Sequence, residues 1–276
     1  MKKVISIILQ GLGILMIILL IVVSIGLIVV YSEPKVPVLC YHNVLSKEEL
    51  EIAKEDAAWS IDVENFEEEM KYLHDSNYKT LTMQEFCEWK EGKKEVPFKS
   101  VLVTFDDGLL SNYHYALPIL KKYNINATIF VIGKASEDLG DDENKWANTP
   151  NSYITKKQIE EIKRDYPNIE LYSHTYGMHR KIRGKEAVHC YTKEQMKDDI
   201  GKYEKYMGKT EYIAYPFGAV NKDFVDVLKE NGYKYGFVFT DNKKATRKDD
   251  NFHINRINVS SNKDMLRFKL RLLLPY

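Results

Sequence analysis

The pair Asp106-Asp107 is a candidate for chemistry because it directly follows the apolar run Ser100 to Phe105. An apolar core cannot stabilise two adjacent carboxylates at a strand end, so they require charged or polar partners. Neighbouring residues there point in different directions, and one aspartate can therefore bind a cation while the other faces substrate or water. Asp-Asp-Gly is also common in ordinary turns, so this pair alone does not establish a site.

The pair His174 and His179 follows another apolar run, Ile169 to Tyr172. On a continuous helix, positions five apart lie roughly 140° apart around the axis, so these imidazoles could share a metal ion only from a loop. Gly177 between them provides the backbone freedom that such a loop needs. The simpler interpretation is a pair of polar surface histidines.

Aspartates and histidines at the same ends of parallel strands would form a metal site with three protein ligands and an open position for water. His42 ends the first predicted strand, which would bring it to the same edge, although a lone histidine is more often a core residue. The segment Ala214–Gly218 is a strand end followed by a turn, which could direct a backbone N–H into the same cleft. The combined pattern favours a site far more than either pair alone.

Short apolar runs alternate with amphipathic stretches from Val36 onward, which is typical of a parallel sheet covered by helices. Each run is brief and bounded by turn residues or charges. The pattern predicts an α/β fold with a closed or nearly closed barrel. The seven predicted strands are Val36–Cys40, Ser100–Phe105, Ala127–Ile132, Ile169–Tyr172, Tyr212–Tyr215, Tyr235–Phe239 and Ile254–Val259.

Several helix boundaries can also be predicted. Apolar residues repeat at helical spacing in Val63–Asp75, and Gly232 follows Val225–Asn231 as a C-terminal cap. Three Thr-x-x-Glu/Gln sequences have the spacing of capping boxes, in which side chains bond the free N–H groups of a first helical turn. These pairs are Thr82 with Glu85, Thr155 with Gln158 and Thr192 with Gln195.

Two stretches fit neither pattern as clearly. The polar segment Lys134–Asn151 contains Gly140, Pro150 and an acidic run, and we expect a long surface loop there. The basic amphipathic tail Met265–Leu274 is expected to pack on the barrel rather than on a membrane.

The N-terminal stretch differs in composition from the rest of the chain. No charged residue lies between Lys3 and Glu33, and the run Val4–Val30 is dominated by Ile, Leu and Val. It is long enough to cross about 30 Å of hydrocarbon, so it predicts a transmembrane helix. The alternative is a cleavable signal peptide, but the run exceeds the usual apolar region of about 7 to 15 residues and no A-x-A-like cleavage site follows.

Lys2 and Lys3 precede this span, so the positive-inside rule places the N-terminus in the cytoplasm and the bulk of the protein outside. We expect a single-pass protein of the cell membrane with an extracytoplasmic catalytic domain. Residues 1–32 would form the short cytoplasmic end and anchor, and residues 33–276 are enough for one medium-sized domain.

Composition narrows the partners and the compartment chemistry. The formal net charge is zero and lysines are scattered, so nothing predicts nucleic-acid binding, and a neutral glycan would be compatible. Cys40, Cys87 and Cys190 are an odd set without paired spacing, which argues against a disulfide framework and a zinc knuckle. We expect all three to be small buried residues.

These segments, in this order, resemble the polysaccharide deacetylase family, also called carbohydrate esterase family 4 or the NodB-homology domain. The resemblance covers roughly Val36–Val259 and implies a deformed (β/α)7-type barrel. Thr104–Gly108 reads T-F-D-D-G, the family's first motif, and His174 with His179 resembles its histidine motif. Four residues separate these histidines instead of the usual three. That spacing, and the opening Pro37–His42, resemble the branch that deacetylates poly-β-1,6-N-acetylglucosamine.

The resemblance implies a metal-dependent enzyme that removes N-acetyl groups from an N-acetylglucosamine polysaccharide. Asp107, His174 and His179 would bind a divalent cation, with zinc the first choice and nickel, cobalt or iron also compatible with nitrogen and oxygen ligands. No other cofactor is implied.

The same resemblance implies roles for the residues around the cation. Asp106 would be the general base, and protonated His42 would donate to the leaving amine. Phe217 and Tyr215 would contribute to oxyanion and substrate binding, Phe217 through its backbone N–H.

One departure from the family concerns the R-x-x-P-Y motif, which here reads Ile213 to Phe217 without the arginine. That arginine orients the catalytic aspartate in typical members, and Arg256 could replace it. The alternative functions are a peptidoglycan or chitin-oligomer deacetylase and a catalytically inactive glycan-binding surface protein.

Overall fold

The structure is a computed structural model that describes residues 2–32, 35–53, 58–140, 152–239, 243–260 and 264–274. The chain divides into two units, Met1–Lys35 and Val36–Leu274, each of which is described by itself. The first is the helix α1, Lys2–Ser32. Its stretch Leu9–Leu27 has a mean hydropathy of 2.6 and is apolar and long enough to cross a membrane, a property that a signal sequence shares.

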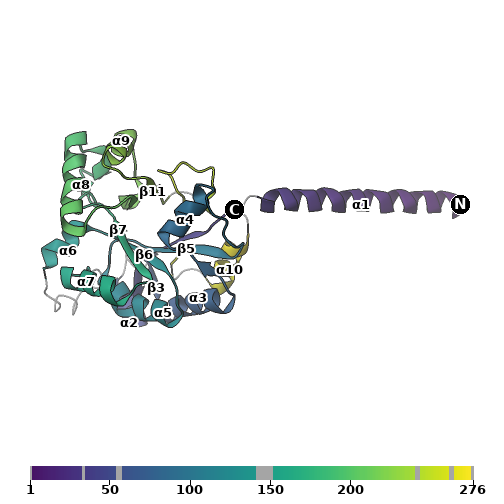
Figure 1. Ribbon diagram of the computed structural model, residues 1–276. Helices are drawn as coiled ribbons and strands as arrows, with labels where there is room; N and C mark the ends of the chain where they lie inside the picture. Colours follow the sequence, from purple (N-terminus) through teal and green to yellow (C-terminus); the bar gives the residue numbers. More distant parts are fainter. Residues whose placement is uncertain are drawn as a thin grey trace. The chain divides into compact units, whose positions relative to one another are not determined.

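An eight-stranded parallel sheet forms the second unit, in the order β11-β10-β7-β6-β5-β1-β12, with β4 paired to β5 (Figure 1). All seven predicted strands occur, so the predicted α/β architecture is confirmed; β4 was not predicted. The strands are β1 Val38–Tyr41, β4 Lys79–Thr80, β5 Ser100–Phe105, β6 Ala127–Val131, β7 Ile169–Ser173, β10 Tyr212–Ala214, β11 Tyr235–Phe237 and β12 Ile257–Asn258.

The two ends of the sheet approach each other through the last strand segment. Phe237 of β11 forms a parallel bridge with Ile254, and three residues later Ile257 of β12 pairs with Leu39 of β1. The predicted strand Ile254–Val259 is therefore shorter than expected. Its first residue pairs with β11 at one edge of the sheet, whereas Ile257 and Asn258 pair with β1 at the other. This arrangement confirms a curled, deformed barrel of the (β/α)7 type.

Helices cover the outside of this sheet (Figure 1). All three predicted capping boxes are formed, at α4, α7 and α8, and α3 buries its predicted apolar stripe. The helices of this unit are α2 Lys47–Ala53, α3 Val63–Asp75, α4 Met83–Lys90, α5 Leu117–Lys122, α6 Gly133–Leu139, α7 Lys156–Asp165, α8 Lys193–Met207, α9 Lys222–Glu230 and α10 Met265–Leu273.

Shorter elements join these. Two short strands form a parallel pair, β2 Asn43–Leu45 and β3 Ser60–Asp62. Two others form an antiparallel hairpin, β8 Lys181–Ile182 and β9 Lys185–Glu186. A π-helical turn, η2 Asn112–Ala116, precedes α5, and the 3₁₀ turns are η4 Ala187–His189 and η5 Pro216–Gly218.

Alternate residues of the central strand face two different apolar layers. Val101 and Val103 of β5 pack in the layer that contains residues of α3 and α5, whereas Leu102 packs inside the barrel with Phe86 and Trp89 of α4. This period of two is the one expected of a strand. Both layers exclude water from the strands, so polar side chains are accommodated at the strand ends.

Two expectations were wrong. Lys134–Asn151 does not begin as a loop: α6 covers Gly133–Leu139, while residues 141–151 lie outside the described part. This helix has no apolar stripe; its first N–H groups instead bond to the carbonyls of Thr175 and Tyr176, at 3.1 and 2.8 Å. Cys40 and Cys87 are buried as expected, but Cys190 is exposed because it follows a surface turn.

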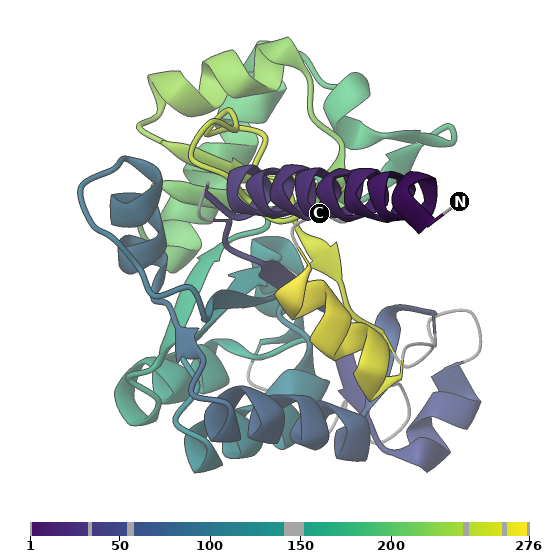
Figure 2. The ribbon, with the colours of Figure 1, turned by 90° about the vertical axis from the view of Figure 1, so that its right-hand side faces the viewer.

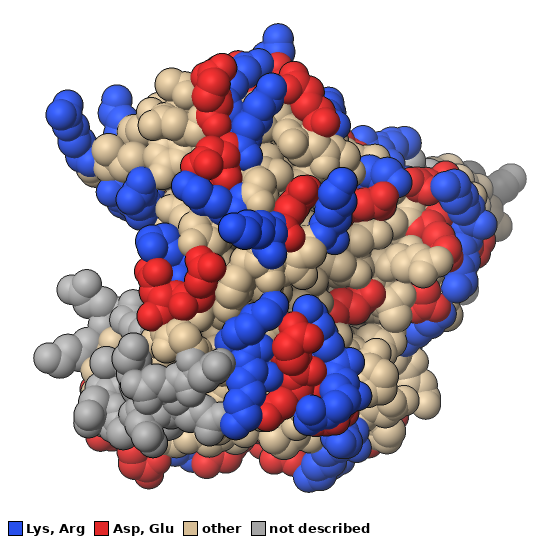
Figure 3. All heavy atoms as spheres, turned by 60° about the vertical axis from the view of Figure 1, so that its left-hand side comes forward, with Lys and Arg blue, Asp and Glu red and all other residues tan. Residues whose placement is uncertain are grey.

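Basic and acidic side chains are interspersed on the face shown in Figure 3, where no large patch of a single sign appears. This distribution agrees with the zero formal net charge.

Candidate active site

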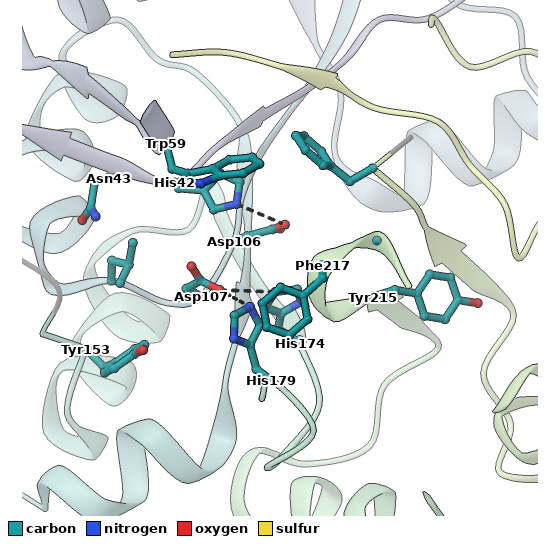
Figure 4. Close-up of a pocket in the computed structure, with 13 residues that line it drawn as sticks. His42, Asn43, Trp59, Asp106, Asp107, Tyr153, His174, His179, Tyr215 and Phe217 are labelled. Carbon is teal, nitrogen blue, oxygen red and sulfur yellow. Dashed lines mark ion pairs between the residues drawn. The ribbon is translucent and has the colours of Figure 1, made fainter. Parts of the chain in front are cut away.

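The carboxyl ends of four strands of the sheet surround one pocket of about 370 Å³ (Figure 4). His42 follows β1, Asp106 and Asp107 follow β5, His174 follows β7, and Phe217 follows β10. Parallel strands place these ends at the same edge of the sheet. The residues proposed from the sequence as catalytic, metal-binding or substrate-binding, including His179 and Tyr215, all border this pocket.

Asp107, His174 and His179 converge as the sequence predicts. The Nε2 atoms of both histidines lie 3.3 Å from Asp107 Oδ1 (Figure 4). The three potential ligand atoms lie within 4.8 Å of one another. Asp107 Oδ1 is buried and has no hydrogen-bond partner of good geometry in the described part of the chain. A carboxylate oxygen buried between two ring nitrogens fits a cation, which would satisfy all three atoms at once.

The main chain fixes the orientation of His174. Its Nδ1 lies 2.8 Å from the carbonyl oxygen of Ala214, so Nδ1–H donates there and the Nε2 lone pair faces Asp107. Burial by itself would lower the pKa of His174, but the neighbouring Asp106 and Asp107 carboxylates raise it above its ordinary value. The same negative potential would favour a bound cation.

The loop from His174 to His179 has the irregular backbone that the five-residue spacing requires. Thr175 has a φ of 67°, in the left-handed region that β-branched residues rarely adopt. The next two N–H groups, of Tyr176 and Gly177, donate to the buried Asp199 carboxylate of α8 at 2.8 and 2.7 Å. Burial raises the pKa of Asp199 to about 6. Asp199 was not identified from the sequence, because a lone acidic residue on a helix usually faces solvent.

Asp106 is held by a buried guanidinium. Arg256 donates from both terminal nitrogens to its two oxygens, at 2.7 Å each, and also donates to the carbonyl of Val238 at 3.2 Å. Burial would raise the pKa of Asp106, but Arg256, with His174 and His42, outweighs this effect and keeps that pKa well below its ordinary value. Arg256, suggested from the sequence as a replacement for the missing arginine, thus contacts Asp106 directly. The Cys40 thiol donates to the same carboxylate at 3.6 Å.

His42 lies on the other side of Asp106, with 4.0 Å between its Nε2 and Asp106 Oδ2 (Figure 4). The ring packs against Trp59 and Phe239, at centroid distances of 5.2 and 6.2 Å. Burial lowers the pKa of His42 despite the nearby carboxylates. The His42 imidazole is therefore predominantly neutral at pH 7.

The turn after β10 brings its backbone into the pocket. Phe217 has a φ of 59°, which is uncommon for a residue with a side chain, and its ring packs against that of His179, with 4.4 Å between the ring centroids. Gly218 has a φ of 68°, and a Cβ there would lie 2.9 Å from the backbone nitrogen of Phe239. The Tyr215 ring is fully buried, packs against Phe224 and points away from the histidines (Figure 4), so only its main chain faces the pocket.

Aromatic residues that sequence reasoning did not identify complete the pocket. Trp59 is 42% exposed and Phe217 is 45% exposed, so both present ring faces at the opening. Tyr153 and Phe239 also line it. An isolated aromatic residue is far more often part of a core, and nothing in the spacing of these residues distinguishes them.

Comparisons with known proteins agree with this site. The polysaccharide deacetylase family matches residues 93–236, a range that includes Asp106, Asp107, His174 and His179. The chain is 33% identical to the poly-β-1,6-N-acetyl-D-glucosamine N-deacetylase of Staphylococcus aureus strain MRSA252, over 83% of this chain and 80% of that protein.

Solved structures show the same similarity. The Streptococcus pyogenes deacetylase PplD in complex with acetate has a TM-score of 0.68 and 25% identity, covering 86% of this chain and 98% of that one. IcaB from Ammonifex degensii has a TM-score of 0.67 and 25% identity, covering 88% and 97%.

Proposed function

Because the chain belongs to the polysaccharide deacetylase family, we propose that it deacetylates an extracellular N-acetylglucosamine polysaccharide, and that poly-β-1,6-N-acetylglucosamine is the preferred one. The chain is a hydrolase of carbon–nitrogen bonds other than peptide bonds. The observation that carries the proposal is the pairing of Asp106 with Arg256 directly beside Asp107 and its two histidines. The specific glycan is supported by the Staphylococcus relatives, which are poly-β-1,6-N-acetyl-D-glucosamine N-deacetylases.

Asp107, His174 and His179 would hold a divalent cation, zinc first and nickel, cobalt or iron as alternatives. The fit rests on the buried Asp107 oxygen without a good hydrogen-bond partner and on the fixed orientation of His174. When bound, such a cation supplies a Lewis acid for the acetamide carbonyl and lowers the pKa of water.

Asp106 is proposed to accept the proton of the attacking water. Arg256 keeps Asp106 ionised and fixes its plane, so that the carboxylate is ready to act as a base at neutral pH. The arginine bonds both carboxylate oxygens, which leaves the remaining lone pairs for water.

His42 is proposed to donate a proton to the leaving amine. Its position 4.0 Å from Asp106 places it next to the group that takes up the proton of water. An amine leaves poorly unless it is protonated, so the neutral imidazole must first gain a proton during the cycle.

The backbone N–H of Phe217 is proposed to stabilise the oxyanion that forms when water attacks. The left-handed conformation of this residue, held by Gly218, turns the main chain of the loop toward the pocket. A donor of this kind typically contributes about 3 to 4 kcal/mol to the transition state.

The helix α1 is proposed to be a single membrane anchor, with residues 33–276 outside the cytoplasm. The support is the apolar stretch Leu9–Leu27 and the two lysines that precede it. An extracytoplasmic site is also where an extracellular polysaccharide can be reached.

Acetate release from matched oligomers tests the substrate. We expect the rate on β-1,6-linked N-acetylglucosamine oligomers to exceed the rate on chitin oligomers and peptidoglycan, measured as kcat/KM for each. A higher kcat/KM on chitin oligomers or peptidoglycan would show that the preferred glycan is wrong but that the chain is a deacetylase. Glycan binding without acetate release from any of them would instead indicate an inactive binding protein.

A further inference from the structure

The C-terminal helix α10 has apolar residues on two different faces. Phe268 and Leu272 are buried, and the Phe268 ring lies 6.2 Å from that of Tyr72 on α3. This contact confirms the expectation that the tail packs on the barrel, and Figure 2 shows α10 in yellow on the outside of the unit. The buried face therefore explains only part of the helix's apolar character.

The second face is exposed. Leu266 is 64% exposed, and Leu270 and Leu273 are also exposed. Positions 266, 270 and 273 follow one another at intervals of four and three residues, so they form one row along the helix. We call these three residues the leucine row. An exposed row of this kind marks an interaction surface more often than an isolated leucine does.

The charged residues within α10 are all basic, and Asp264, which caps its N-terminus, is the acidic residue next to it. Arg267, Lys269 and Arg271 belong to α10, and no acidic residue lies between Met265 and Leu273. Arg267 is exposed, and the Lys269 ammonium lies over the Tyr72 ring at 4.9 Å. Leucines on an exposed face with basic neighbours are typical of helices that lie at the surface of an anionic bilayer.

Contacts within the second unit connect α10 to the point where this unit joins the N-terminal helix. Val36, the first residue of the unit, pairs with Ala245 through two backbone hydrogen bonds of 3.0 and 2.9 Å. The adjacent Lys244 donates from its buried ammonium to the carbonyl of Leu272 at 2.8 Å. The end of α10 is therefore fixed near Val36.

The length of the tether limits how far Val36 can lie from a bilayer. Only residues 28–35 separate Val36 from the apolar stretch that ends at Leu27. Even fully extended, eight residues span at most about 30 Å. A surface near Val36 is thus always within reach of the membrane if α1 is an anchor.

We propose that the leucine row, with Arg267 and Lys269 beside it, docks on the surface of an anionic lipid bilayer. This second contact would orient the catalytic unit on the membrane. The inference rests on the proposed anchoring by α1.

The test uses the full chain, with Cys190→Ser to remove the exposed thiol, reconstituted in phosphatidylcholine vesicles with or without phosphatidylglycerol. An environment-sensitive fluorophore is attached at Leu266→Cys. We expect lipids with brominated acyl chains to quench this label strongly when phosphatidylglycerol is present. The quenching should fall by at least about twofold when phosphatidylglycerol is omitted. It should fall by a similar factor when the chain also carries Arg267→Gln and Lys269→Gln.

A label at Ile52→Cys is the matched control, because Ile52 is 65% exposed and equally apolar but lies on α2. Its quenching should stay low in both kinds of vesicle. Equal quenching at positions 266 and 52 would overturn the proposal. So would a label at 266 that is shielded from water but not quenched by lipid, since a second copy of the chain would then cover the leucine row.

Flotation of the vesicles after an alkaline wash tests the anchor separately. Chain that no longer floats would refute anchoring by α1, whereas floating chain with an unquenched label at position 266 would refute only the docking of α10. Acetate release by the same vesicles reports the proposed activity independently of both.

Discussion

Asp106 and Asp107 are adjacent in sequence but have different partners, and this difference separates their proposed roles. Asp106 bonds a buried guanidinium with both oxygens, whereas Asp107 turns one oxygen toward two imidazoles. The positive φ of Asp107, 72°, contributes to this divergence. The sequence could predict that the two would diverge, because adjacent residues at a strand end point in different directions.

Asp106→Asn separates the base from the cation site. Asparagine keeps the shape of the side chain but cannot accept the proton of water, so kcat should fall by about 10² to 10⁴. The metal content, measured by elemental analysis, should stay at the wild-type level because Asp107 and both histidines are unchanged. Wild-type turnover by this variant would show that Asp106 is not the base.

Arg256 illustrates what residue types alone cannot predict. It lies 150 positions from Asp106, and the possibility that it replaces the motif arginine rested on the gap in the motif. The pairing depends on β12 lying next to β1, which is a property of the closed sheet and not of any local pattern. Trp59 and Phe239 likewise join the site through tertiary contacts with the His42 ring, which no local pattern predicts.

Among the elements, those with a repeating pattern were predicted and those without one were not. β5 is buried at every position and α3 has a regular apolar stripe, so both could be located from the sequence. β4 has only two residues, and α6 is stabilised by carbonyls of the loop after β7. The hairpin β8–β9 is likewise too short and too polar to produce a period.

The contact between α8 and the His174–His179 loop predicts a role for Asp199. In Asp199→Asn, the side-chain oxygen can accept only one of the two N–H bonds, and the amide group opposes the other. Metal affinity should fall about 10- to 100-fold, as for other residues that orient metal ligands. Competition with a chelator measures this, and Asp198→Asn on the exposed side of the same helix should have little effect.

The stability of the same variant should show a changed pH dependence. The pKa of Asp199 is raised from 3.8 to about 6, so the native chain keeps a proton there that the unfolded chain has already released. This group's contribution to stability is therefore lost as pH rises from about 4 to about 6. The free energy of unfolding, measured with urea across that pH range, should decline less steeply with pH for Asp199→Asn than for wild type. An unchanged slope would contradict the assignment.

For the molecule as a whole, a ligand that joins the ends of β5 and β7 should stabilise the native state. A cation at one hundred times its Kd would add about 2.7 kcal/mol to the free energy of unfolding. Chelation should therefore lower Tm and abolish acetate release, and zinc should restore both. In His174→Ala, Tm should no longer respond to zinc. An identical response in wild type and variant would place the cation elsewhere.

The pairing of β1 with β12 has a consequence for how the protein is made. His42 emerges early in synthesis and Arg256 emerges close to the end, yet both flank Asp106. A chain whose synthesis has not yet reached Arg256 therefore carries Asp106 without the guanidinium that keeps it ionised. If Asp106 is the base, a chain that ends before Arg256 should have no deacetylase activity, even though His42, Asp106 and both histidines are already present.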